Sequence, residues 1–134
     1  MLEQLSLREC WQLLDEAEIG RVAVLVDGAP EIFPVNHAVD DQTIVFRTAA
    51  GSKLRGLAQS PSVCFEVDGV SSISHTGWSV LVKGKATELR TAEETSGARR
   101  LPLEYWAQGE KDHWIRIRPL QVTGRRIYLP RSER

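Results

Sequence analysis

The sequence predicts a mainly β (α+β) fold. The chain is expected to form a single domain over residues 1–134, an antiparallel small barrel or sandwich with short connecting helices. Six or seven apolar, β-branched segments follow one another at a spacing of about ten residues. Turns of hairpin length separate many of them, which favours antiparallel pairing. A chain of 134 residues with 42% hydrophobic content has the size and composition of one globular domain.

The first predicted element is an amphipathic helix over residues 6–18. Ser6 followed by Glu9 is the signature of a capping box. The apolar residues behind it recur at helical spacing, and the helix is expected to end near Gly20. These apolar residues are Leu7, Cys10, Trp11, Leu14 and Ala17.

A hairpin is predicted next, with strands over residues 21–27 and 31–39. Asp27 and Gly28 between them form a common hairpin turn sequence. Pro34 lies inside the second strand and has no N–H to donate to a ladder. That strand is therefore expected to be an edge, or to carry a bulge, at Pro34.

The middle of the chain predicts a strand over residues 43–50 and a short helix over 52–59. The strand alternates its side chains between two faces, so Phe46 and Thr48 share one face and Arg47 lies on the other. Pro61 is expected to stop the helix, because the residue before a proline disfavours helical geometry.

The second half of the chain contains the remaining strands and one further helix. Thr91 is the expected N-cap of that helix, and residues 102–112 predict no element. The closing segment reads as one or two strands. The predicted ranges are strands 62–69 and 77–89, a polar loop between them, helix 91–101, and closing segments 113–120 and 125–129.

Charge and composition exclude several classes of partner. The chain carries 17 Lys+Arg and 18 Asp+Glu, a formal net charge of −1, so no nucleic-acid partner is expected. No run approaches the roughly 18 apolar residues that span a bilayer, so no membrane partner is expected. Without a signal-peptide pattern, we expect a cytoplasmic protein in which Cys10 and Cys64 are reduced thiols.

The sequence contains no recognisable catalytic or metal-binding motif. Its three histidines are 38 residues apart, and no spacing typical of zinc ligands occurs, so no metal is predicted. A nucleophile elbow, a Walker phosphate loop and a dinucleotide-binding glycine pattern are also missing. Catalytic residues therefore remain unknown.

The most informative segment is FRTAAGSKL, residues 46–54. There a strand ends at Arg47 and Thr48, the chain turns through Gly51, and a helix begins at Ser52 and Lys53. Free N–H groups at a helix start favour an anion, and these side chains add donors and positive charge. The segment is either a phosphate cradle or a capped surface turn with solvated charges.

Four tryptophans form the second signal: Trp11, Trp78, Trp106 and Trp114. Trp114 shares a strand face with Arg116 and Arg118. An aromatic ring beside arginines can stack on a planar ligand, although the same ring can belong to a core or a dimer interface.

The order of these segments resembles one known family. GRVAV, PVN, FRTAAGSK, GWSVLVKGKA and WIRIRP…TGRR follow one another as in the pyridoxamine 5′-phosphate oxidase-like flavin-binding split barrels. The small, nitroimidazole-resistance-like branch is the most similar, and the resemblance covers about residues 5 to 128. It implies an antiparallel split β-barrel and a single flavin-binding domain.

The resemblance also implies a homodimer with FMN at the subunit interface and a flavin-dependent oxidoreductase activity on a small molecule. Phosphate contacts would come from Arg47, Thr48, Ser52 and Lys53. Ring contacts would come from Pro34, Val35, Asn36, Phe46, Trp78, Ser79 and Val80, with Trp114 and Arg116 from the partner chain.

Two alternatives stay open within this resemblance. A deazaflavin, coenzyme F-420, would replace FMN in a reductase, or the protein would bind or sense a flavin without turnover. Because a flavin performs hydride transfer itself, a chain without a catalytic motif is compatible with an oxidoreductase. The substrate and the electron donor cannot be predicted from the residues.

Overall fold

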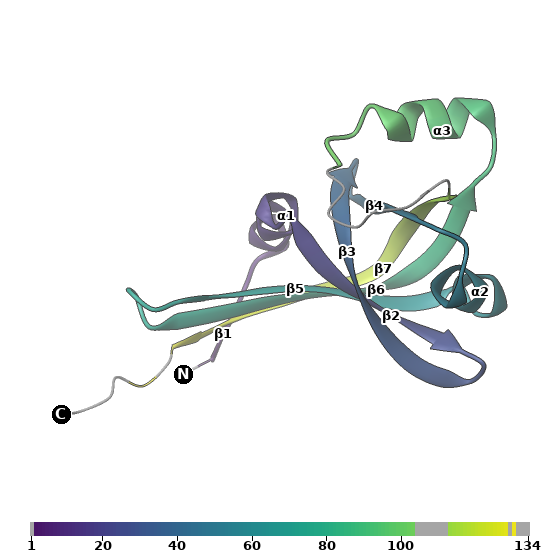
Figure 1. Ribbon diagram of the computed structural model, residues 1–134. Helices are drawn as coiled ribbons and strands as arrows, with labels where there is room; N and C mark the ends of the chain where they lie inside the picture. The colour runs from purple at the N-terminus through teal and green to yellow at the C-terminus, as the bar shows by residue number, and fades with distance from the viewer. Residues whose placement is uncertain (1, 104–112, 129, 131–134) are drawn as a thin grey trace.

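The computed structural model describes residues 2–103, 113–128 and 130, and they form one antiparallel sheet that closes on itself (Figure 1). Its strand order is β1-β7-β4-β3-β2-β5-β6, and β6 also pairs with β7. This last pairing closes a barrel, with β1 attached to β7 alone. The predicted mainly β split barrel with short connecting helices is confirmed.

The predicted helices and strands are present, and most of their ends shift by one or two residues. A short strand at the N-terminus was not predicted. The strands are β1 (Leu2–Gln4), β2 (Ile19–Val26), β3 (Ala29–Asp40), β4 (Thr43–Thr48), β5 (Ser62–Ser71), β6 (Thr76–Leu89) and β7 (His113–Tyr128). The helices are α1 (Leu7–Glu16), α2 (Ser52–Gln59) and α3 (Ala92–Arg99).

Capping boxes start α1 and α3. In α1, Glu9 N–H donates to the Ser6 hydroxyl and Ser6 N–H donates to the Glu9 carboxylate, both at 3.1 Å. Thr91 and Glu94 form the same reciprocal pair at the start of α3. Both predicted N-caps are confirmed.

Pro34 lies where β3 has a neighbour on one side only. Residues 29–36 of β3 pair with β2, whereas residues 37–40 pair with β4. The expected local edge is therefore present at Pro34. The closing segment is one long strand, and its ladder with β6 is irregular where Lys83 pairs with Gln121 and Gly84 with Pro119.

Two hydrophobic clusters stabilise the barrel. The larger fills its interior and includes Phe46, Phe65 and Leu14. The smaller lies under α3 and consists of Val45, Leu89, Ala98 and Trp114, with Leu101 and Leu103 packed against it. β4 contributes to both clusters because successive side chains of a strand point to opposite faces.

The described part of the chain shows no disulfide: Cys10 is a buried free thiol and Cys64 is a partly buried one. Burial raises the pKa of the Cys10 thiol. None of the described helices is long and apolar enough to cross a membrane. The described residues also contain no cluster of three or more metal-ligating side chains.

Candidate functional site

The turn between β4 and α2 has the geometry of an anion cradle. Gly51 is the N-cap of α2 and has φ of 156° and ψ of −163°, a conformation that is essentially restricted to glycine. Among the described residues no side chain caps the helix, and its first turn holds no acidic residue. The positive end of the helix dipole at Gly51 therefore has neither a capping side chain nor a carboxylate of the first turn beside it.

The other two helices begin differently. Their N-termini accept Glu9 and Glu94, whose hydrogen bonds to backbone and hydroxyl groups lower the pKa of each carboxyl. These carboxylates already occupy the positions that an anion would take. Of the three described helices, α2 is therefore the one that begins without an internal acid.

Arg47 and Lys53 flank the turn, each above an aromatic ring. The Arg47 guanidinium carbon lies 4.5 Å from the centroid of Trp114, and the Lys53 ammonium lies 5.3 Å from that of Phe33. Cation–π contacts of this kind hold a charged side chain in a defined direction. One cation is thus supported by β7 and the other by β3.

The hydroxyl groups of Thr48 and Ser52 differ in their exposure at the turn. Thr48 is buried, and its hydroxyl donates to the carbonyl of Ala49 at 3.2 Å. Ser52 is partly exposed at the first position of α2. A cavity of about 400 Å³ adjoins Gly51 between α2 and the end of β6, with Arg55 and Arg90 among its lining residues.

The three predicted ring contacts on β3 lie together on its edge segment. Pro34 is exposed, Asn36 is partly buried and Val35 is buried. An edge segment presents backbone N–H and C=O groups that no second strand pairs. Phe46, by contrast, is fully buried in the larger cluster, so its side chain is part of the barrel core.

Trp114 and Arg116 are both engaged within their own chain. The Trp114 side chain is 2% exposed, and its indole N–H has no acceptor among the described residues. Arg116 donates to the Asp40 carboxylate at 2.9 Å and to the Thr43 hydroxyl at 2.7 Å. Arg116 thereby ties β7 to the turn between β3 and β4.

The β6 residues Trp78, Ser79 and Val80 lie far from the cradle in the same chain. Arg47 pairs with Trp114, and Trp114 pairs with Leu89 at the other end of β6. From Leu89 back to Trp78 the strand runs about 36 Å. In Figure 1 the β5–β6 hairpin extends away from α2, so one chain does not bring these two groups of residues together.

Trp78, Ser79 and Val80 also differ in how deeply their side chains are buried. Val80 is fully buried in the larger cluster, and Trp78 packs partly against it. The absence of a side chain at Gly69 makes room for the Trp78 indole, because an added Cβ would lie 2.7 Å from that ring. Ser79 pairs with Asp68 of β5.

A charged cluster that the sequence did not predict lies beside Ser79. The Arg21 guanidinium lies 3.0 Å from the Asp68 carboxylate and 3.4 Å from that of Glu66. Burial and the neighbouring Asp68 outweigh Arg21 and raise the pKa of Glu66 to about 6. The cross-strand register of β2 and β5 creates this cluster, since Arg21 pairs with Glu66.

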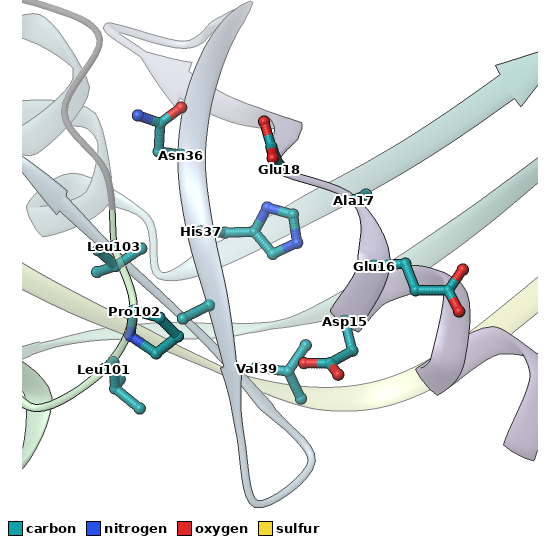
Figure 2. A pocket seen from close by; sticks show the side chains of 11 residues that line it. Asp15, Glu16, Ala17, Glu18, Asn36, His37, Val39, Leu101, Pro102 and Leu103 are labelled. Carbon is teal, nitrogen blue, oxygen red and sulfur yellow. The ribbon is translucent and has the colours of Figure 1, made fainter.

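A second pocket contains a histidine that sequence reasoning left out of the site. It lies between the end of α1, β3 and residues 101–103, with a volume of about 380 Å³ (Figure 2). His37 forms part of its wall and is 6% exposed. The sequence feature that could have pointed to His37 is its position between Val35 and Val39, because strand alternation there predicts an inward-facing side chain.

The closed antiparallel sheet places the chain in the class of split β-barrels, and comparison with known proteins identifies the family. The family model for pyridoxamine 5′-phosphate oxidase matches residues 6–126. The chain therefore belongs to the pyridoxamine 5′-phosphate oxidase family, and the resemblance seen in its motifs is confirmed.

Individual relatives cover nearly the whole chain. An uncharacterized protein of Mycobacterium tuberculosis is 35% identical over 129 residues, which are 92% of this chain and 84% of that protein. The structure of a candidate pyridoxamine 5′-phosphate oxidase from Corynebacterium glutamicum is 34% identical, with a TM-score of 0.86, and covers 98% of this chain and 96% of its own. A FAD-binding protein from Mycobacterium smegmatis is 38% identical, with a TM-score of 0.78 and coverage of 94% and 98%.

Proposed function

We propose that this protein binds FMN between two copies of the chain and acts as a flavin-dependent oxidoreductase on a small molecule. The observation that carries the proposal is the open N-terminus of α2 behind Gly51, flanked by Arg47 and Lys53. Membership of the family and the FAD-binding relative support a flavin as the ligand.

The cradle residues fit a terminal phosphate. Arg47 and Lys53 would offset its negative charge, and the hydroxyl and N–H of Ser52 would donate to its oxygens. Gly51 lets the backbone approach closely because it carries no side chain. The Arg47 and Lys53 side chains already lie beside the turn, because each is held there by an aromatic ring.

The edge of β3 suits the polar side of an isoalloxazine ring. Backbone groups of β3 near Val35 and Asn36, where the strand pairs with β2 alone, would offer donors and acceptors to the ring, while Pro34 would add an apolar contact. A bound flavin supplies the hydride transfer, and the protein supplies position and electrostatics. The chain itself therefore needs no acid–base pair for the transfer.

A second copy of the chain completes the proposed site. Because Trp78, Ser79 and Val80 lie at the far end of the long hairpin, they can reach the same ring only from the partner subunit. Exposed apolar side chains on three strands are available for such an interface: Ile32 is 67% exposed, and Val70 and Leu120 are each 75% exposed.

Mixing two defective variants tests the shared site. Lys53→Ala removes a cradle charge, and Trp78→Ala removes a ring contact that we assign to the other subunit. In a mixed dimer one site would carry both changes and the other neither, so FMN binding should return to half of the wild-type stoichiometry. Titration of co-expressed, doubly tagged dimers measures this. A mixed dimer that stays as defective as both parents would contradict a shared site.

Reduction of the bound cofactor separates an enzyme from a sensor. As an oxidoreductase, the FMN-loaded protein should lose its flavin absorption when NADH or NADPH is added without oxygen. Free FMN at the same concentration is the control. A spectrum that neither nucleotide changes would argue for a binder without turnover.

A further inference from the structure

Arg47 and Trp114 lie side by side on one face of the sheet. They are register partners on β4 and β7, and the Arg47 guanidinium carbon lies over the indole, 4.5 Å from its centroid. This distance is within the range of a cation–π contact. Because β4 ends at Thr48 and α2 begins behind Gly51, the contact lies directly before the cradle turn.

The indole of Trp114 is fixed by its surroundings. Trp114 pairs with Leu89 of β6, and both side chains belong to the smaller cluster together with Val45 of β4 and Ala98 of α3. The Trp114 side chain is 2% exposed. A side chain packed to this depth occupies one rotamer. The ring is therefore a rigid platform that three strands and α3 hold in place.

Hydrogen bonding does not account for a tryptophan at this position. The buried indole N–H of Trp114 has no acceptor among the described residues, and a buried donor without a partner is unfavourable. What the indole offers is its ring. It fills the cluster under α3, and its face is the strongest aromatic partner for a cation. Arg47 is the cation that lies over this face.

Stacking on a ring is compatible with binding an anion. The guanidinium group is planar, so an aromatic ring contacts its face, whereas phosphate oxygens accept from N–H groups along its edge. An arginine side chain loses rotamer freedom when it binds an anion. A side chain that is already ordered in the free protein loses less, and the anion then binds more tightly.

We propose that Trp114 is a positioning residue for phosphate: it holds Arg47 with the guanidinium edge toward the cradle, and it thereby favours phosphorylated over unphosphorylated ligands. The inference rests on the proposed function only through the phosphate cradle and does not depend on the flavin ring. Trp114 acts through Arg47 of its own chain and does not itself contact the phosphate.

Inorganic phosphate is the first probe, and NMR of the Ser52 backbone N–H and the Arg47 side chain reports its binding. Trp114→Leu should weaken phosphate about two- to fivefold, the size of a cation–π contact at a partly exposed site. Trp114→Phe keeps an aromatic ring in the cluster and should fall between the wild type and Trp114→Leu. An Arg47 Nε–H resonance that phosphate does not move, or an affinity that neither variant changes, would overturn the proposal.

A double-mutant cycle separates positioning from a merely structural role. Arg47→Ala should weaken phosphate at least about tenfold, because a charge-assisted contact is lost. In the Arg47→Ala background, Trp114→Phe should have no further effect, since nothing remains for the ring to hold. An effect of Trp114→Phe that persists in this background would overturn the proposal.

Trp11→Phe is the matched control. Trp11 packs partly against the larger cluster from α1, and Figure 1 shows α1 well apart from α2. The substitution removes the same atoms as Trp114→Phe and should leave the phosphate affinity unchanged. A loss as large as that of Trp114→Phe would show a general effect of packing and overturn the proposal.

FMN and riboflavin extend the test to a larger ligand. The ratio of their affinities should fall in Trp114→Phe by the same factor as the phosphate affinity, because riboflavin lacks the phosphate. An unchanged ratio would contradict the positioning role. A protein that binds phosphate but neither flavin would contradict the proposed function and leave the role of Trp114 intact, whereas a cycle without coupling would remove that role and leave flavin binding in place.

Discussion

Gly51 is the residue on which the proposed cradle depends most. Its backbone occupies a region that side chains strongly disfavour, and this conformation starts α2 without a side-chain cap. The motif around Gly51 was visible in the sequence, because a glycine between a strand and a Ser-Lys helix start is a local pattern. The unusual φ and ψ were not, since only the folded turn sets them.

Gly51→Ala should destabilise the fold by about 1–3 kcal/mol because alanine must adopt this strained conformation. No atom lies near the added Cβ, so the effect isolates backbone strain. Gly97→Ala is the matched control: Gly97 lies within α3 in open space, and alanine there should stabilise by about 0.5–1 kcal/mol. Urea unfolding measures both. Two changes of the same sign would contradict the account of the turn.

Lys53→Ala should weaken FMN binding at least about tenfold, or 1.4 kcal/mol, because a charge-assisted phosphate contact is lost. Lys83→Ala is the control, since Lys83 is an exposed lysine on the distant middle of β6. Fluorescence quenching of added FMN reports both affinities. An unchanged affinity for the Lys53 variant would remove Lys53 from the site.

At the scale of elements, features set by neighbouring residues could be predicted, whereas features set by the pairing of distant residues could not. The starts of α1 and α3 follow from capping boxes contained within four residues. β1 could not be predicted because its three residues become a strand only by pairing with β7, where Leu2 meets Ile127. The β2–β5 register likewise created the cluster of Arg21, Glu66 and Asp68 from residues far apart in sequence.

This cluster gives β2 and β5 a pH-dependent link. The pKa of Glu66 rises from 4.5 to about 6 in the folded state, so the native protein binds more protons than the unfolded chain between these values. The contribution of Glu66 to stability is therefore fully present below pH 4.5 and is lost as the pH rises through about 6.

Glu66→Gln should remove this dependence. The variant should gain stability relative to the wild type as the pH rises from 4.5 to 6, with a constant difference at higher pH. Asp27→Asn is the control, because Asp27 also pairs with an arginine, Arg55, at an exposed turn. Thermal unfolding across this pH range gives the result. Parallel stability profiles for the Glu66 variant and the wild type would contradict a raised pKa.

At the scale of the whole molecule, the order of the motifs predicted the barrel and its family. It could not show which of the predicted site residues the fold buries and which it brings together within one chain. Phe46, Val80 and Trp114 were chosen by motif, and the fold buries all three. His37 was left out, and the fold places it in a pocket wall. Burial depends on which strands meet, and that information is spread over the whole sheet.

The identity of the cofactor released from the purified protein tests the central claim most directly. The account predicts a yellow protein with absorption near ~450 nm, because a bound flavin supplies the colour. It also predicts that denaturation releases a compound with the mass of FMN, in about one copy per chain. A protein that is colourless and takes up no added FMN, or that releases a deazaflavin instead, would contradict it.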